Sequence, residues 1–158
     1  MKNLFFVCLG LVYILSIGCQ MNLAKSYRAR INCIKIDEQN YIEKQKVNKI
    51  KPANVLLVQV LNNPFEFSTQ SKMIFYINGT PLYKDIFKIQ FPVTINLNDK
   101  ELVHCRIEII EGDCLYVFED KSVFNWDVNF KFIYAAFFPD NSTTDNIHFF
   151  PQQQLVVQ

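Results

Sequence analysis

The chain has 158 residues, with sixteen basic and fifteen acidic side chains, half of its residues hydrophobic and four glycines. A charge balance so close to zero argues against a broad basic face for nucleic acid, and so few glycines leave no glycine-rich phosphate loop. We therefore expect no nucleic-acid partner and no cofactor.

The N-terminus has the anatomy of a secretory signal peptide. Lys2 supplies a short positive region, residues 4–17 are almost unbroken apolar sequence, and Ser16 and Gly18 place small residues at the −3 and −1 positions of a cleavage site. A transmembrane helix needs about 20 apolar residues, so this shorter run favours removal. The sequence predicts a signal peptide over residues 1–18 and a single secreted domain over residues 19–158.

Cys19 leaves a second interpretation open. In a bacterial lipoprotein the cut precedes a cysteine that then carries the lipid, and Cys19 directly follows Gly18. Such sites usually have a bulky apolar residue at −3, where this chain has Ser16. If Cys19 is lipidated, the protein associates with a membrane in the bacterial envelope and acts as an adaptor or adhesin.

After the leader, the chain shows strand-like alternation and little helical periodicity. Residues 38–49 are the one helix candidate, and a loop or irregular strand is favoured there. The run ANVLLVQVL at residues 53–61 is apolar on both faces, which predicts a central strand. Further strands are expected at residues 30–36, 72–77, 86–97, 102–110, 126–138, 147–150 and 155–157.

Turn signals separate these strands. Asn78-Gly79 is typical of a hairpin turn, Glu111-Gly112-Asp113 reverses the chain, and Pro92 indicates an edge strand or a bulge. About eight strands joined in this way predict an all-β fold, an antiparallel immunoglobulin-like β-sandwich.

Aromatic side chains are abundant, with fifteen Phe and seven Tyr. The alternation places a group of them between the sheets, where they either fill the core or line an apolar pocket for a ligand. The residues are Phe75, Phe87, Phe91, Phe130, Phe132 and Tyr134.

The cysteines predict disulfides, because export places them in an oxidising compartment. A Cys105–Cys114 bridge would close a loop of about ten residues and stabilise the fold by about 2.5–3 kcal/mol. Cys19–Cys33 would follow if Cys19 carries no lipid. No C-x-x-C occurs and the two histidines are far apart in sequence, so no metal site is expected.

Motifs for catalysis are absent from the sequence. There is no G-x-S-x-G, H-E-x-x-H or Walker loop, and we expect no enzyme and no catalytic residue. Asn78-Gly79-Thr80 and Asn141-Ser142-Thr143 match the N-glycosylation sequon, which makes Asn78 and Asn141 candidate glycan sites.

The layout of residues 31–157 resembles the ML family, the MD-2-related lipid-recognition domains. CRIEIIEGDC, residues 105–114, resembles the family's short disulfide loop, and WDVNFKFIYAAFFPDNSTTDNIHFF resembles its paired final strands. The chain departs from the family pattern in having Leu115 where a proline is common, and in lacking a cysteine in the last strand. The resemblance implies a secreted immunoglobulin-like sandwich that holds a lipid between its sheets without catalysis.

Together these features favour a secreted, non-catalytic protein that holds a lipid or another hydrophobic small molecule. A protein partner is a further expectation. The bacterial lipoprotein remains the alternative.

Overall fold

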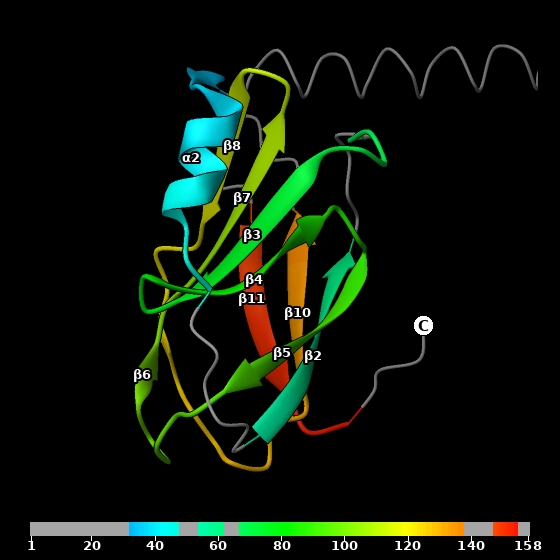
Figure 1. Cartoon of the computed structure of the whole chain (residues 1–158). Coiled ribbons are helices and arrows are strands. Elements are labelled where there is room, and N and C mark those ends of the chain that lie inside the picture. The colour runs from blue at the N-terminus through cyan, green and yellow to red at the C-terminus, as the bar shows by residue number, and fades with distance from the viewer. Residues whose placement is uncertain (1–31, 48–53, 62–66, 138–146, 155–158) are drawn as a thin grey trace, which may run out of the picture.

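The protein is described by a computed structural model over residues 32–47, 54–61, 67–137 and 147–154. The predicted signal peptide, Cys19 and Asn141 lie outside these residues. The described chain folds as an all-β sandwich, as expected from the sequence (Figure 1).

One layer is a five-stranded antiparallel sheet. Its order is β1, β8, β7, β3, β4. The strand bounds are β1 Ile34–Lys35, β8 Cys114–Glu119, β7 Cys105–Glu111, β3 Lys72–Ile77 and β4 Thr80–Ile86.

The other layer is a four-stranded sheet in the order β11, β10, β2, β5. The bounds are β11 Ile147–Gln152, β10 Phe132–Phe137, β2 Asn54–Leu61 and β5 Gln90–Ile95. β2 is central, as its apolar sequence predicts, and its pairing with β10 is parallel while the other pairings are antiparallel. A further short pair joins β6 (Leu102–Val103) to β9 (Phe124–Asn125).

The described residues form eleven strands, of which eight are six or more residues long and three have two residues. The expected strand at residues 155–157 lies outside the described residues. β4 and β8 were not expected from the sequence. The stretch 80–86 contains Pro81, Lys84 and Asp85, and its pattern of partly exposed side chains does not alternate.

The helix α2, Glu38–Lys44, corrects the expectation of a loop or irregular strand. Asp37 caps its first turn, since the Asp37 side chain accepts a hydrogen bond from Asn40 N at 3.1 Å. Glu38 lies in the first turn and Lys44 in the last turn, where each charge interacts favourably with the helix dipole.

The turn between β3 and β4 follows its sequence signal. Asn78 and Gly79 both have positive φ, 50° and 75°, which the hairpin requires and which asparagine and glycine tolerate best. The Asn78 side chain also bridges to the start of the next hairpin, donating to Leu102 O and accepting from His104 N, each at 2.9 Å.

The edges of both sheets are poorly suited to pairing with another strand. Pro81 lies in β4, Pro92 in β5 and Pro151 in β11, and the fourth edge, β1, has two residues. Proline lacks the N–H that a ladder needs, so these edges resist edge-to-edge association. The expectation that Pro92 marks an edge strand is confirmed.

Candidate functional site

The two sheets come together along β4 and β5, an edge strand of each. The chain crosses from one sheet to the other through residues 87–89, where Phe87 N donates to Ser71 O and Val60 N donates to Ile89 O, both at 2.7 Å. We call this region the β4–β5 margin and define it by Tyr83, Ile86, Phe87 and Ile89.

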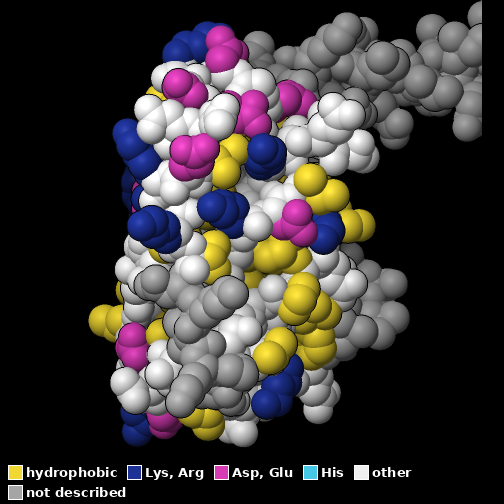
Figure 2. All heavy atoms as spheres, viewed as in Figure 1, with side chains coloured by type: hydrophobic (Ala, Val, Ile, Leu, Met, Phe, Trp, Pro, Cys, Tyr) yellow, Lys and Arg dark blue, Asp and Glu magenta, His cyan; other side chains and the backbone are white. Residues whose placement is uncertain are grey.

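The β4–β5 margin carries exposed apolar side chains beside an ion pair, in which Lys88 Nζ lies 2.9 Å from Asp85 Oδ2. Ile86 is 46% exposed and Ile89 64% exposed, while Tyr83 and Phe87 are partly buried against the core. Hydrophobic side chains gather on the right of the space-filling view, where β4 leads into β5 (Figure 2). Such groups on a surface are typical of contact sites for apolar partners.

Aromatic rings continue from the margin into the sandwich. The Tyr83 ring lies 4.3 Å from that of Phe91, and Phe87 lies 5.8 Å from Phe67. Phe67 in turn contacts Tyr116 of β8, with centroids 5.6 Å apart. A series of ring contacts thus connects the margin to the interior.

Four of the six aromatic residues predicted to face the interior do so. Phe75 and Phe91 are fully buried, with ring centroids 5.8 Å apart across the two sheets, and Phe87 and Phe130 pack against the same cluster. Phe118 and Phe137 form another ring contact between the sheets at 5.0 Å. At these points the space between the sheets is occupied by side chains.

The other two, Phe132 and Tyr134, were assigned to the wrong face. The inward residues of β10 are Ile133, Ala135 and Phe137, whereas Phe132 and Tyr134 stack on the outer face with centroids 6.3 Å apart. Both faces of this strand are apolar, so alternation could not distinguish them, and a shift of one residue exchanges the faces.

The disulfide joins Cys33 to Cys114, with their Cα atoms 5.1 Å apart. The predicted Cys105–Cys114 pair is wrong because β7 and β8 form a hairpin. Cys105 begins β7 and Cys114 begins β8, so the two residues lie at opposite ends of the antiparallel pair. Seven residues of strand hold them about 20 Å apart, far beyond the reach of a disulfide. The Cys33–Cys114 bond also excludes the Cys19–Cys33 pairing.

Cys105 is instead a buried thiol, 1% exposed. Burial raises the pKa of the Cys105 thiol, and the negative charge of Asp120 raises it further. A thiol held in its neutral form is a poor nucleophile and a poor metal ligand, so Cys105 acts as a small core residue.

Asp120 is a second buried polar group, 4% exposed, at the end of β8. Burial opposes its ionisation, but hydrogen bonds from Ser122 and from the backbone N–H of Phe149 outweigh that effect and lower the pKa of the Asp120 carboxyl. The His148 ring lies 3.4 Å away. Since Phe149 belongs to β11, this carboxylate ties the two sheets together.

A third polar group lies on the outer face of the five-stranded sheet. The Glu108 side chain is 3% exposed, and its Oε2 accepts hydrogen bonds from Tyr41 at 2.9 Å and from Tyr76 at 2.6 Å. Arg106 pairs with Oε1 at 3.1 Å and lies over the Tyr76 ring. The carboxylate is therefore well satisfied, as a buried charge must be.

Both tyrosines respond to this environment. Burial, and then the hydrogen bond to Glu108 and its charge, raise the pKa of Tyr41 to about 12, and the same causes raise the pKa of Tyr76 further. The hydroxyls remain donors across the physiological range, which suits a structural network rather than proton transfer.

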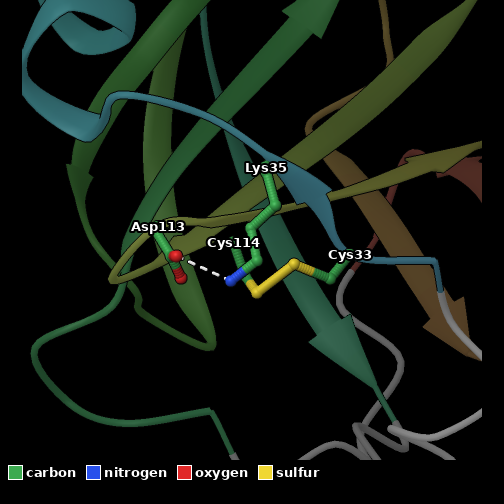
Figure 3. The surroundings of a disulfide bond; sticks show 4 residues. All are labelled: Cys33, Lys35, Asp113 and Cys114. Carbon is green, nitrogen blue, oxygen red and sulfur yellow. Dashed lines mark hydrogen bonds and ion pairs between the residues drawn. A yellow bond between two sulfur atoms is a disulfide. The ribbon is translucent and has the colours of Figure 1, made fainter.

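The N-terminal segment attaches beside the disulfide. Lys35 is the register partner of Cys114 across β1 and β8, and its ammonium lies 2.6 Å from the Asp113 carboxylate. Figure 3 shows the Lys35 side chain reaching Asp113 on the Cys114 side of the disulfide. The hydrogen bond from Lys35 lowers the pKa of Asp113.

Among the described residues, no helix is long and apolar enough to span a membrane, and no cluster of three or more metal-ligating side chains occurs. Asn78 is exposed, and its glycosylation stays a prediction.

Comparison with known proteins gives no assignment. No protein-family model, no curated protein and no solved structure matches the chain.

Proposed function

We propose that this protein is a secreted, non-catalytic binding protein for a lipid or another hydrophobic small molecule, and that the ligand binds at the β4–β5 margin. The observation that carries the proposal is the exposure of Ile86 and Ile89, which flank the partly buried Phe87 in the chain. A ligand placed there would cover apolar surface that otherwise faces water.

An apolar chain at the margin would contact the partly buried Tyr83 and Phe87 without entering the core. Deeper in the sandwich, Phe75 and Phe91 pack ring against ring, and opening that contact would forfeit dense packing. At the margin the two sheets are joined through the connection 87–89, and Tyr83 and Phe87 are partly buried. We therefore place the ligand along the edge of the sandwich, with Phe87 and Tyr83 against it.

Secretion is part of the same proposal. The Cys33–Cys114 bond supports an oxidising compartment, and the sequence of residues 1–18 supports export. An intact mass of the mature protein from its native host would show whether it begins at Cys19, and whether Cys19 carries lipid.

Binding can be tested with a fluorescent fatty-acid analogue and with native mass spectrometry of the purified protein. We expect Ile89→Glu to weaken binding of the analogue by about tenfold, which corresponds to about 1.4 kcal/mol. The charged side chain would have to be desolvated beneath the ligand. Because Ile89 is 64% exposed, the fold should tolerate this substitution.

Leu102→Glu is the matched control. Leu102 is 59% exposed and lies in β6, away from the margin (Figure 1). Equal affinities of wild type, Ile89→Glu and Leu102→Glu for the analogue would contradict binding at the margin. Protein that neither carries lipid nor binds the analogue would contradict the function.

A further inference from the structure

The segment of residues 33–45, comprising β1 and α2, is attached to the outside of the sandwich (Figure 1). It covers an apolar area on the outer face of the five-stranded sheet, where Tyr41 and Ile42 pack on the sheet. The area itself is nearly inaccessible to solvent and consists of Ile74, Tyr76, Ile110 and Leu115, which are 0–4% exposed.

The cover has little intrinsic stability. β1 pairs with β8 at two register positions, and α2 has seven residues, none of them buried. Isolated helices shorter than about 12–15 residues are marginal in water. The segment must therefore be held by its attachments to the sheet.

The attachments are distributed along the segment, and they include an ion pair at 3.4 Å between Glu38 at the start of α2 and Lys72 of β3. The Cys33–Cys114 disulfide and the Lys35–Asp113 ion pair hold the start of the segment. The Tyr41–Glu108 hydrogen bond holds its middle. At the helix end, Lys84 of β4 donates to Ile42 O at 3.1 Å and to Gln45 O at 2.8 Å. The disulfide is the covalent attachment among them.

The main core of the sandwich is a separate cluster from the one beneath this cover. The main core is built from the long strands of both sheets, and Cys33 is its one contact with residues 33–45, as a partly buried neighbour. Segments with few buried contacts open locally at a free energy well below that of global unfolding.

We propose that the Cys33–Cys114 disulfide is a redox-controlled lock on the β1–α2 segment, so that reduction releases the segment and uncovers the apolar area beneath it. A dithiol reductant supplies the two electrons. Its thiolate attacks one sulfur to give a mixed disulfide and releases the other cysteine, which takes up a proton. The second thiol of the reductant then displaces the remaining cysteine, leaving two cysteine thiols and an oxidised reductant.

The surroundings of the bond suit this exchange. Cys33 and Cys114 are both partly exposed, in contrast to the buried Cys105. Lys35 is the cross-strand partner of Cys114, and its side chain lies beside that cysteine (Figure 3). A neighbouring ammonium stabilises the departing thiolate, and a thiolate that is easier to form leaves faster.

Release of α2 would also reach β4. Lys84 would lose its two carbonyl acceptors at the end of α2, and β4 is an edge strand with a neighbour on one side only in its sheet. We expect the amides of β4 to lose some protection when the lock opens, although less than those of α2.

The test compares oxidised wild-type protein with protein reduced by dithiothreitol, using hydrogen exchange read by mass spectrometry. Peptides covering residues 37–45 should lose protection on reduction, while those from β7 and β10 keep it. Fluorescence of Trp126, which is the single tryptophan and is 1% exposed, should stay unchanged, and an apolar dye should bind more strongly.

Two results would overturn the proposal. If residues 37–45 keep their protection after both thiols are shown to be free, the disulfide does not control the segment. If Trp126 and the peptides of β7 and β10 change together with residues 37–45, the bond is a staple of the whole fold. The Cys33→Ser variant should match the reduced protein without any reductant present.

Lys35→Gln tests the chemistry separately. This variant should be reduced more slowly by dithiothreitol than wild type, whereas Lys100→Gln, which removes an exposed lysine far from the bond, should not differ. Equal rates for all three proteins would remove the role of Lys35 in the exchange.

Discussion

The two sheets share one interior but differ on their outer faces. The outer face of the five-stranded sheet carries the charged residues Lys72, Lys84, Arg106, Glu108 and Glu119, and α2 lies across part of it. The outward positions of the four-stranded sheet carry no Asp, Glu, Lys or Arg. They are Val55, Leu57, Gln59, Leu61, Gln90, Pro92, Thr94, Phe132, Tyr134, Ala136, His148, Phe150 and Gln152.

The difference shows what a covering helix does to a sheet. Beneath α2, the side chains of Ile74 and Ile110 are as buried as any in the interior, so the outer face has become a second core. Glu108 can be buried there because Tyr41 from the helix and Tyr76 from the sheet both donate to it. Without a helix, Val55 remains 60% exposed on the other sheet.

The largest expected effect comes from truncating a residue under the helix. Ile74→Ala should destabilise the protein by about 2–5 kcal/mol, the usual cost for a fully buried isoleucine, because Ile74 is 0% exposed. Val55→Ala on the other outer face should change stability by less than about 0.5 kcal/mol. Urea unfolding followed by Trp126 fluorescence measures both, and equal losses would mean that the two faces do not differ.

Removing the buried carboxylate should have the next largest effect. Glu108→Ala leaves two tyrosine hydroxyls and Arg106 without their acceptor. Breaking a buried ion pair costs about 3–5 kcal/mol, and we expect about 3 kcal/mol because the Arg106 side chain is 31% exposed. Glu119→Ala, which removes a carboxylate with a side chain 47% exposed, is the control and should cost less than about 1 kcal/mol. A comparable loss in the control would show that burial is not the cause.

The sequence predicted the sandwich well where strands have one polar face. The alternation in the stretch 86–97 identified β5 and its inward residues Phe91 and Val93. It failed for β10, where Ile133 and Ala135 face inward and Phe132 and Tyr134 face outward, because large aromatic side chains occur on both sides. Periodicity reveals the inward face of a strand only when the other face is polar. The outer face of β10 is uncharged, so its two faces could not be distinguished.

The cysteine pairing shows a different limit. The turn at Glu111-Gly112-Asp113 was recognised, and a hairpin at that turn already places Cys105 and Cys114 at opposite ends. Loop length alone therefore predicted the wrong cysteine pair, which the geometry of the antiparallel hairpin excludes. Cys33 can pair with Cys114, 81 residues away in the sequence, only because β1 joins the edge of the sheet next to β8. No local sequence pattern predicts that pairing of strands.

The hydrogen-bond network around Glu108 could not be predicted from the sequence. Glu108 lies on the polar side of an alternating strand, a position that by itself indicates exposure to water. Its burial requires α2, a helix of seven residues in a chain with little helical periodicity. A capping residue followed by a first-turn carboxylate was the local sign that could have revealed the helix.

Substitution of Asp120, which links the two sheets, should reduce stability by an intermediate amount. Asp120→Asn should cost about 1–3 kcal/mol at pH 7, because an amide cannot accept hydrogen bonds from both Ser122 N and Phe149 N. The pKa of Asp120 is lowered in the folded protein, so its contribution is present above pH 3.8 and is lost as the pH falls through the lower folded value. Unfolding by urea from pH 7 to pH 2.5 should show a shallower acid loss in Asp120→Asn than in wild type, and parallel profiles would contradict this assignment.

The smallest expected effect comes from removing the hydroxyl of Tyr41, the side chain of α2 that donates to Glu108. Tyr41→Phe removes one donor to Glu108 while Tyr76 keeps the other, and it should cost about 1 kcal/mol at pH 8. Wild-type protein should also lose stability as the pH rises from 10 towards 12. The unfolded tyrosine ionises near pH 10, whereas the folded one keeps its proton until about pH 12. The variant lacks this contribution, so the difference between the two proteins should shrink at alkaline pH, as measured by urea unfolding at pH 8 and pH 10.5. A difference that stays constant between these pH values would show that the Tyr41 hydroxyl does not hold α2 to the sheet.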